Sequence, residues 1–346
     1  MSSRRKFVLA SRASKLAQIQ TDSVRDELQA AFPDLTFETS FMTTEGDKNQ
    51  SQALYLLGGK SLWTKELEVA MMENVVDMLV HCCKDVPTVL PEGCELAAIL
   101  EREDPVDVLV VKEGLPYKTL EDLPDGSVVG TSSVRRVAQL RRKYPKLAFL
   151  DVRGNLTTRL AKLDAPDAPY SAIILAKAGM VRQGLGPRIT CDLGPPTLFY
   201  AVGQGALVIE ICSKDAETRK ICAALTHRPT ELKCLAERSC LRVLEGGCSV
   251  PVGVCTELAE DGTMNITGCV TSIMGEAHVQ HTLTEKVESA EEAEKLGARL
   301  AKVLMDTGAK AILDDIQVDR SKRTGENKTV AEGLKIESAM EGPATS

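Results

Sequence analysis

The feature that most constrains this chain is a recurring unit: a short apolar strand, then a polar loop, then a helical pattern. A strand is predicted over residues 6–10, and a polar loop over 11–14 leads into apolar residues at helical spacing. The same order begins again at residues 75–80 and at residues 127–129. Strands alternating with helices favour parallel sheets with helices on their faces. Ligands of such sheets bind beyond the carboxyl ends of the strands, so the loops after the strands are the predicted site.

The 346 residues are enough for two or three domains, since a domain takes roughly 150 residues. Composition changes near residues 102–105 and 225–229, which divides the chain into three modules. Beyond residue 229 the pattern predicts a helix, then alternating strands near 265–270 and 279–284, and then an amphipathic helix ended by Gly308. This last module is therefore predicted to be α+β. The polar stretch 319–346 is predicted to be disordered.

Charge is the second constraint. Lys and Arg number 42 against 49 Asp and Glu, so the formal charge is −7, and a nucleic-acid-binding protein is disfavoured. Aromatic residues are only 3%, too few for stacking on bases. An anionic ligand would need a local basic cluster.

Such a cluster is predicted in residues 130–163. Thr131, Ser132 and Ser133 are helix N-cap residue types, and Arg135 and Arg136 follow in the first helical turn. Cations are disfavoured there by the helix dipole, so their placement indicates an external anion. Downstream arginines, at 153 and 159, extend the cluster, and guanidinium groups grip carboxylates or phosphates in bidentate fashion. Any one of these arginines could equally belong to a solvated basic face, but the set favours a small polyanionic ligand.

Three further positions have two interpretations each. Asp85 could stabilise positive charge on a substrate nitrogen or pass a proton to a leaving amine, or it could form a surface pair with Lys84 in a turn. Cys248, after Gly246 and Gly247, could be a nucleophile or attachment point, or a buried turn cysteine. His81 next to two adjacent cysteines lacks the ligand spacing of a zinc site, so no metal is predicted.

The expected compartment is the cytoplasm. The basic start is followed by an apolar run, residues 7–10, that is too short for the core of a signal peptide, and no stretch approaches ~18 apolar residues. Eleven cysteines at irregular spacing are expected to be reduced and mostly buried.

Taken together, these segments resemble the porphobilinogen deaminase (hydroxymethylbilane synthase) family of tetrapyrrole biosynthesis. The resemblance covers nearly the whole chain in order and spacing. It rests on residues 11–14 (SRAS), 58–60 (GGK), 64–68 (TKELE), 80–81 (VH), 84–88 (KDVPT), 130–136 (GTSSVRR), 153–155 (RGN), 202–207 (VGQGAL) and 245–251 (EGGCSVP).

The resemblance implies a fold of two periplasmic-binding-protein-like α/β domains and a C-terminal α+β domain. Domain 1 would take residues 1–102 and 203–226, domain 2 residues 103–202 and domain 3 residues 227–318. It also implies a monomer that binds porphobilinogen and neither nucleic acid nor membrane. A non-catalytic solute-binding protein with the same bilobed frame is the alternative from another class.

The resemblance further implies a dipyrromethane primer tied by a thioether to Cys248. Porphobilinogen would lose ammonia to form an azafulvene that the terminal pyrrole attacks, and four rounds would give hydroxymethylbilane. Asp85 would stabilise the cationic intermediates. The acid arms of the pyrroles would be bound by Arg12, Ser14, Lys60, Cys82, Lys84, Thr131, Ser132, Ser133, Arg135, Arg136, Arg153, Gly154, Asn155, Arg159, Arg182 and Gln204.

Some positions depart from the family pattern. Cys82 and Cys83 stand where a Ser-Leu pair is usual, which replaces a hydroxyl by a weaker thiol donor. Leu56 stands where many members carry a lysine, and Glu45 is an added residue. Because Asp85 and Cys248 are both retained, the chemistry is expected to survive.

Overall fold

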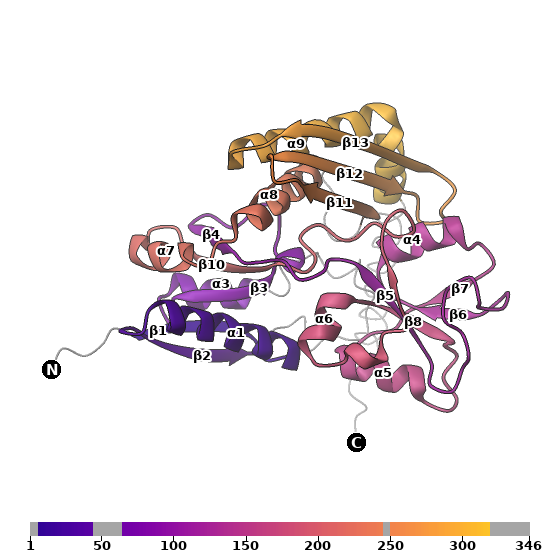
Figure 1. The fold of residues 1–346 in the computed structure, drawn as a ribbon, viewed down its shortest axis with the longest axis horizontal. Coiled ribbons are helices and arrows are strands. Elements are labelled where there is room, and N and C mark those ends of the chain that lie inside the picture. Colours follow the sequence, from indigo (N-terminus) through magenta and orange to yellow (C-terminus); the bar gives the residue numbers. More distant parts are fainter. Residues whose placement is uncertain (1–5, 44–63, 245–249, 319–346) are drawn as a thin grey trace, which may run out of the picture.

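The N-terminal part of the chain forms a five-stranded sheet of order β2-β1-β3-β10-β4. The protein is described by a computed structural model over residues 6–43, 64–244 and 250–318. The strands are β1 (Lys6–Arg12), β2 (Thr36–Met42), β3 (Met78–Cys82), β4 (Cys94–Ile99) and β10 (Leu207–Cys212). The helices that cover the sheet are α1 (Lys15–Ala31), α3 (Lys65–Met72) and α7 (Ala216–Ala223) (Figure 1).

Alternation of side chains along β1 builds two apolar layers on this sheet. Phe7 and Leu9 pack on one face with Leu28 of α1, whereas Ala10 packs on the other face with Leu67 of α3. The strand needs apolar residues at consecutive positions because both of its faces are covered.

The middle of the chain forms a second five-stranded sheet of order β7-β6-β8-β5-β9. Its strands are β5 (Asp107–Val111), β6 (Val128–Gly130), β7 (Ala148–Leu150), β8 (Ala172–Ala176) and β9 (Cys191–Leu193). Its helices are α4 (Val134–Lys143), α5 (Leu156–Asp164) and α6 (Lys177–Arg182). Leu140 of α4 belongs to the core on one face, and Leu163 of α5 and Met180 of α6 belong to the core on the other.

The sheets are mixed, so the prediction of parallel sheets is wrong for one strand in each. β10 runs antiparallel to β3 and β4, and β5 runs antiparallel to β8 and β9. Leu207, at the start of β10, pairs with Cys82 at the carboxyl end of β3. Asp107, at the start of β5, likewise pairs with Ala176 at the end of β8. Both strands arrive from the other sheet and enter at its carboxyl edge, so they must run in the reverse direction.

The C-terminal part is α+β, as predicted, and lies across the two α/β parts (Figure 1). It consists of α8 (Arg228–Val243), an antiparallel sheet of β11 (Val252–Leu258), β12 (Thr263–Thr271) and β13 (His278–Lys286), and α9 (Ala290–Leu304). The predicted stop at Gly308 is confirmed, since its backbone is not helical, with φ +120°. A second helix follows the kink over 310–318, and its Ile312 and Ile316 are buried in the same core.

The predicted fold class is therefore confirmed: two α/β units with the same strand order, followed by an α+β unit. Among the described residues, no helix has the length and apolar character needed to cross a membrane.

Two segments, residues 100–106 and 194–206, connect the two α/β units, and they lie against each other. The backbone N–H of Glu103 donates to the carbonyl oxygen of Gly205 at 3.3 Å. The Arg102 guanidinium donates to the carbonyl oxygen of Gln204 at 2.7 Å. A Cβ at Gly205 would lie only 2.2 Å from the carbonyl oxygen of Glu103, and Gly205 has φ +91°. Only glycine allows this approach.

We therefore expect Gly205→Ala to destabilise the protein more than Gly126→Ala. Gly126 has a similar φ of +81°, but a Cβ there would meet nothing within 4 Å. Both variants should lose about 1–2 kcal/mol of unfolding free energy from the left-handed backbone, and Gly205→Ala about 1–3 kcal/mol more from the contact. Urea unfolding of the two variants measures the difference, and equal losses would contradict this close contact.

Candidate active site

A cavity of about 630 Å³ lies where the carboxyl ends of strands from the two α/β units face each other. The loops after β1, β3, β6 and β7 all contribute to its lining, as predicted for loops that follow strands. The predicted site residues that line it are Arg12, Ser14, Cys82, Lys84, Asp85, Ser132, Ser133, Arg135, Arg136, Arg153, Gly154, Asn155, Arg159, Arg182 and Gln204. Thr131 does not line the cavity. It is buried, and its hydroxyl accepts the backbone N–H of Ser133.

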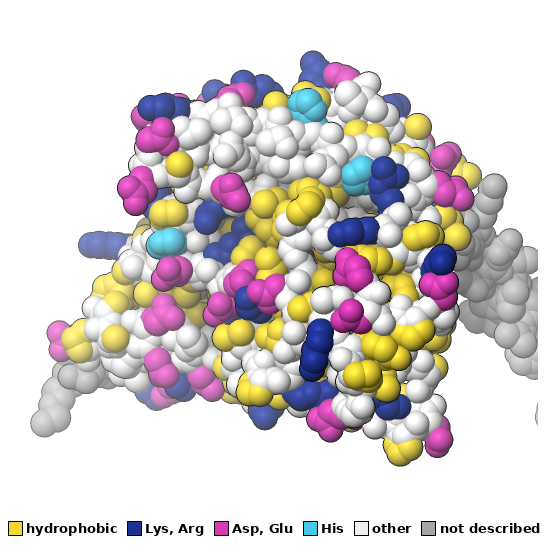
Figure 2. Space-filling model, turned by 45° about the vertical axis from the view of Figure 1, so that its right-hand side comes forward, with side chains coloured by type: hydrophobic (Ala, Val, Ile, Leu, Met, Phe, Trp, Pro, Cys, Tyr) yellow, Lys and Arg dark blue, Asp and Glu magenta, His cyan; other side chains and the backbone are white. Residues whose placement is uncertain are grey.

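The charges in this lining are almost all positive. Seven cations line the described part of the cavity: Arg12, Lys84, Arg135, Arg136, Arg153, Arg159 and Arg182. Asp85 is the single carboxylate in the same lining. It is half-buried, and it forms no hydrogen bond or ion pair with any residue that the structure describes. On the face shown in Figure 2, by contrast, acidic and basic side chains are intermixed.

Neutral acceptors hold several of the cations in place. Arg159 Nε donates to the carbonyl oxygen of Gly154 at 2.8 Å, and Arg182 Nη2 donates to that of Gly205 at 2.7 Å. Lys84 Nζ donates to the side-chain oxygen of Gln204 at 3.2 Å. Such acceptors orient a charge without cancelling it. Burial lowers the pKa of Arg159 to about 10, and the charges of two neighbouring arginines add to this effect.

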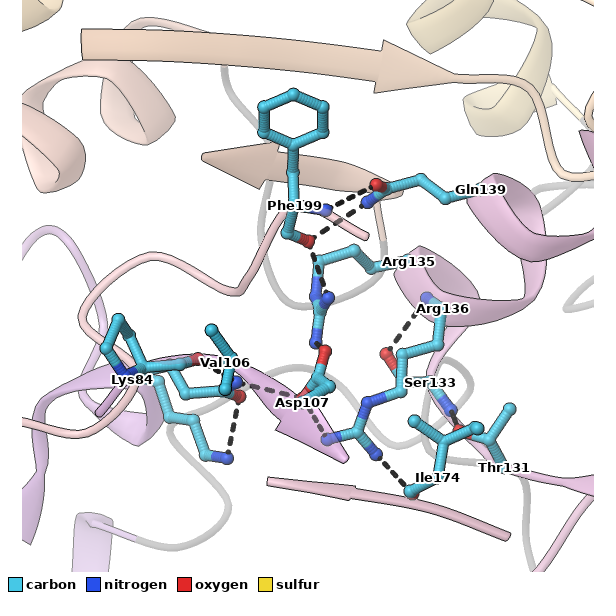
Figure 3. A network of polar contacts seen from close by, with 12 residues as sticks. Lys84, Val106, Asp107, Thr131, Ser133, Arg135, Arg136, Gln139, Ile174 and Phe199 are labelled. Atoms are coloured by element: carbon cyan, nitrogen blue, oxygen red, sulfur yellow. Dashed lines mark hydrogen bonds and ion pairs between the residues drawn. The ribbon is translucent and has the colours of Figure 1, made fainter. Parts of the chain in front are cut away.

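Arg135 and Arg136 share a counter-ion within the protein (Figure 3). Arg135 Nη2 lies 2.8 Å from one oxygen of Asp107, and Arg136 Nη2 lies 2.7 Å from the other. Their remaining Nη groups donate to the carbonyl oxygens of Phe199 and Ile174. Asp107 supplies one internal counter-ion for these two guanidinium groups, so their position in the first helical turn does not by itself require an external anion.

Asp107 was not predicted as a site residue from the sequence. The signal for it is a carboxylate directly before an apolar run, residues 108–111. The structure shows that Asp107 is fully buried there, a position that a carboxylate occupies only when it is paired. Burial alone would raise the pKa of Asp107, but the charges of Arg135 and Arg136 and the hydrogen bond from Gln204 hold that pKa well below its ordinary range.

Three helices begin at the cavity, and predicted site residues cap them. Ser14, Ser133 and Asn155 are the N-caps of α1, α4 and α5, and each side chain accepts a backbone N–H from the first turn. The N-cap prediction at Ser133 is confirmed. Ser132 instead donates to the carbonyl oxygen of Val152 at 3.0 Å. The positive ends of three helix dipoles thus add to the charge of the arginines.

Cys82 and His81 have different surroundings although they are adjacent. The Cys82 thiol faces the cavity and accepts a hydrogen bond from Gln20 Nε2 at 3.2 Å. Burial raises the pKa of Cys82, and the negative charge of Asp85 raises it further. His81 does not line the cavity, and its Nε2 lies 3.2 Å from the buried carboxylate of Glu210.

Several predictions fall outside the described residues: the roles of Lys60 and Cys248, the departures at Glu45 and Leu56, and the disorder of residues 319–346. Val250, two residues beyond Cys248 in the chain, does line the cavity.

Comparison with known proteins decides what this cavity belongs to. A family model described as the porphobilinogen deaminase dipyrromethane cofactor binding domain matches residues 7–220, and one for the porphobilinogen deaminase C-terminal domain matches residues 231–306. The chain belongs to the porphobilinogen deaminase family. Family membership gives it the porphobilinogen deaminase activity of tetrapyrrole biosynthesis and a dipyrromethane cofactor. The alternative of a non-catalytic solute-binding protein is thereby excluded.

Relatives from distant organisms agree over almost the whole chain. The porphobilinogen deaminase of Yarrowia lipolytica is 51% identical over 322 residues, which cover 92% of this chain and 95% of the relative. That of a Nostoc species is 50% identical over 315 residues, which cover 91% of this chain and 96% of the relative. The periplasmic aliphatic sulphonate binding protein SsuA of Escherichia coli aligns with a TM-score of 0.37 and 13% identity, over 88% of each chain.

The closeness of Cys82 to Asp85 predicts a change in thiol reactivity. Asp85→Asn removes a negative charge that disfavours the thiolate, so it should lower the pKa of Cys82 and speed its alkylation by iodoacetamide at pH 8 roughly threefold or more. Peptide mass spectrometry over time measures the rate. Cys212, which does not line the cavity, is the internal control. An unchanged Cys82 rate would show that the two groups do not interact.

Proposed function

We propose that this cavity joins porphobilinogen units on a dipyrromethane primer attached to Cys248, with Asp85 as the catalytic group. The observation that carries the proposal is that the carboxylate of Asp85 has no hydrogen bond or ion pair with a described residue, in a cavity whose described lining includes seven cations. Opposite charges in a partly desolvated cavity attract strongly, so an acid left unpaired there is available for a substrate cation.

The donors of the cavity fit the acid arms of pyrroles. Arg153 Nη1 and Arg136 Nε are buried, and neither has a hydrogen-bond partner among the described residues. A buried donor without a partner is costly, so a ligand that supplies carboxylate oxygens would satisfy both groups. Each pyrrole of dipyrromethane and of porphobilinogen carries an acetate and a propionate. The residues present therefore fit the cofactor that the family implies.

The residues of the chain have two different roles in this reaction. Arg12, Arg153, Arg159 and Arg182 bind and orient carboxylates, each as a fixed positive group. The carboxylate of Asp85 stabilises the positive charge that develops on the substrate as ammonia leaves. When bound, the dipyrromethane supplies the nucleophilic pyrrole carbon. Four rounds, each releasing one ammonia, followed by hydrolysis of the bond to the primer would yield free hydroxymethylbilane.

The remaining assignments are also proposals. We place domain 1 at residues 1–102 and 203–226, domain 2 at 103–202 and domain 3 at 227–318, divisions that follow the two connecting segments. We also propose a monomer, which the family resemblance implies. A cytoplasmic location is supported by the ten described cysteines, which are all free thiols.

Asp85→Asn is expected to reduce turnover of porphobilinogen by roughly 10²-fold, because the amide cannot stabilise the substrate cation. Ammonia release and formation of the linear tetrapyrrole both measure this. Asp104→Asn is the matched control, since Asp104 pairs with Lys177 outside the cavity lining and should keep near-normal turnover. Turnover by Asp85→Asn at the control level would refute the catalytic role of Asp85.

Purified protein is expected to be heavier than its sequence mass of 37.4 kDa by one dipyrromethane, and Cys248→Ser is expected to lack this addition. Intact mass spectrometry measures both, with Cys212→Ser as a control that should retain the adduct. A wild-type protein that has the bare sequence mass and is inert towards porphobilinogen would overturn the proposed function.

A further inference from the structure

We propose that Asp107 is a positioning residue, which keeps Asp85 unpaired by holding Arg135 and Arg136 away from it. The inference rests on the proposed role of Asp85. It explains how a cavity with seven cations can leave its single carboxylate without an ion pair in the described part of the chain.

The first step is the geometry around Asp107 (Figure 3). Its side chain is fully buried. One carboxylate oxygen accepts hydrogen bonds from Arg136 Nη2 at 2.7 Å and Gln204 Nε2 at 2.9 Å, and the other oxygen forms an ion pair with Arg135 Nη2 at 2.8 Å. Arg135 and Arg136 are themselves almost fully buried, and both line the cavity that contains Asp85. Asp107 itself does not line the cavity. Asp107 therefore binds the two arginines from outside the cavity lining.

The second step is electrostatic. The charge of Arg136 lowers the pKa of Arg159, and the charge of Asp85 raises it. Arg136 and Asp85 therefore both interact electrostatically with the guanidinium group of Arg159. Neutral carbonyl oxygens, those of Phe199 and Ile174, are the other acceptors of Arg135 and Arg136. Without the charge of Asp107, the strongest partner left in the described cavity lining would be the carboxylate of Asp85.

The third step concerns Lys84, the direct neighbour of Asp85. Gln204 Nε2 donates to Asp107 and to the carbonyl oxygen of Pro105, at 2.9 and 2.6 Å. Because the amide nitrogen of Gln204 is held by these two acceptors, its amide oxygen points toward Lys84 Nζ and accepts a hydrogen bond from it. Asp107 therefore sets the orientation of the group that holds Lys84. Three cations of the cavity lining that contains Asp85 therefore depend on the carboxylate of Asp107.

The test compares Asp107→Asn with Glu237→Gln. Glu237 is also fully buried, and it accepts from both Nη groups of Arg102 and from the backbone N–H of Gly203. Neither Glu237 nor Arg102 lines the cavity. Both variants remove a buried charge that holds arginine, so both should lose thermal stability.

Only Asp107→Asn should change the chemistry. We expect its kcat for porphobilinogen to fall about tenfold or more, with KM changed less than about threefold, because Asp85 acts on the cation that forms after binding. We also expect the acid limb of its pH–rate profile to move roughly half a pH unit or more to lower pH, since a paired carboxylate is harder to protonate. Glu237→Gln should keep the wild-type shape of the profile.

A second readout does not need turnover. Carbon-13 NMR of labelled aspartate, with the Asp85 signal assigned by its loss in Asp85→Asn, follows protonation of this carboxyl directly. The signal should titrate at lower pH in Asp107→Asn than in wild type. Identical titrations in the two proteins would overturn the inference. If wild type failed to turn over porphobilinogen, the proposed function would fail, and this titration would still decide whether Asp107 keeps Asp85 unpaired.

Asp107→Asn leaves two buried guanidinium groups without their counter-ion, and such a change can prevent folding. In that case Asp107→Asn combined with Arg135→Gln removes the charged pair together and still leaves Arg136 without its anchor. The same shift of the Asp85 titration is expected for this double variant, and its absence would again overturn the inference.

Discussion

The structure depends on positive charge that is held in a partly desolvated cavity without being cancelled. Backbone carbonyl oxygens and one amide orient Arg159, Arg182 and Lys84, and these acceptors are neutral. Asp107 cancels one charge of the pair formed by Arg135 and Arg136. The cavity therefore retains a strong attraction for a polyanionic ligand, which is a property of the fold and not of the chain's overall charge of −7.

The two connecting segments position the residues that hold these cations. They meet at Gly205, and they carry Asp107 and Gln204 to the edge where both sheets end. Glu237 of α8 then ties the C-terminal unit to them, since it binds Arg102 on one segment and Gly203 on the other. The C-terminal unit is thus fixed at the same edge, where Leu241 of α8 and Val252 of β11 line the cavity.

The fold and most of the cavity lining could be predicted from local patterns. Loops after apolar strands were the predicted site, and the loops after β1, β3 and β6 do line the cavity. The role of Arg135 and Arg136 was harder to predict, because their counter-ion lies at position 107, outside the local helix. The reversal of β5 and β10 was missed for a related reason: periodicity predicts a strand but not its direction.

The sequence by itself determined the two α/β units, the α+β unit, the family and the residues available for chemistry. Periodicity and motifs are local patterns, so they can be recognised without knowledge of the tertiary structure. The tertiary structure alone decided which cations of the described cavity lining are already paired and which carboxylate there has no described partner. That outcome depends on contacts between residues far apart in the chain, such as Asp107 with Arg135 and Lys84 with Gln204. Charge–charge energies change steeply with distance and burial, and both are set only when the segments have packed together.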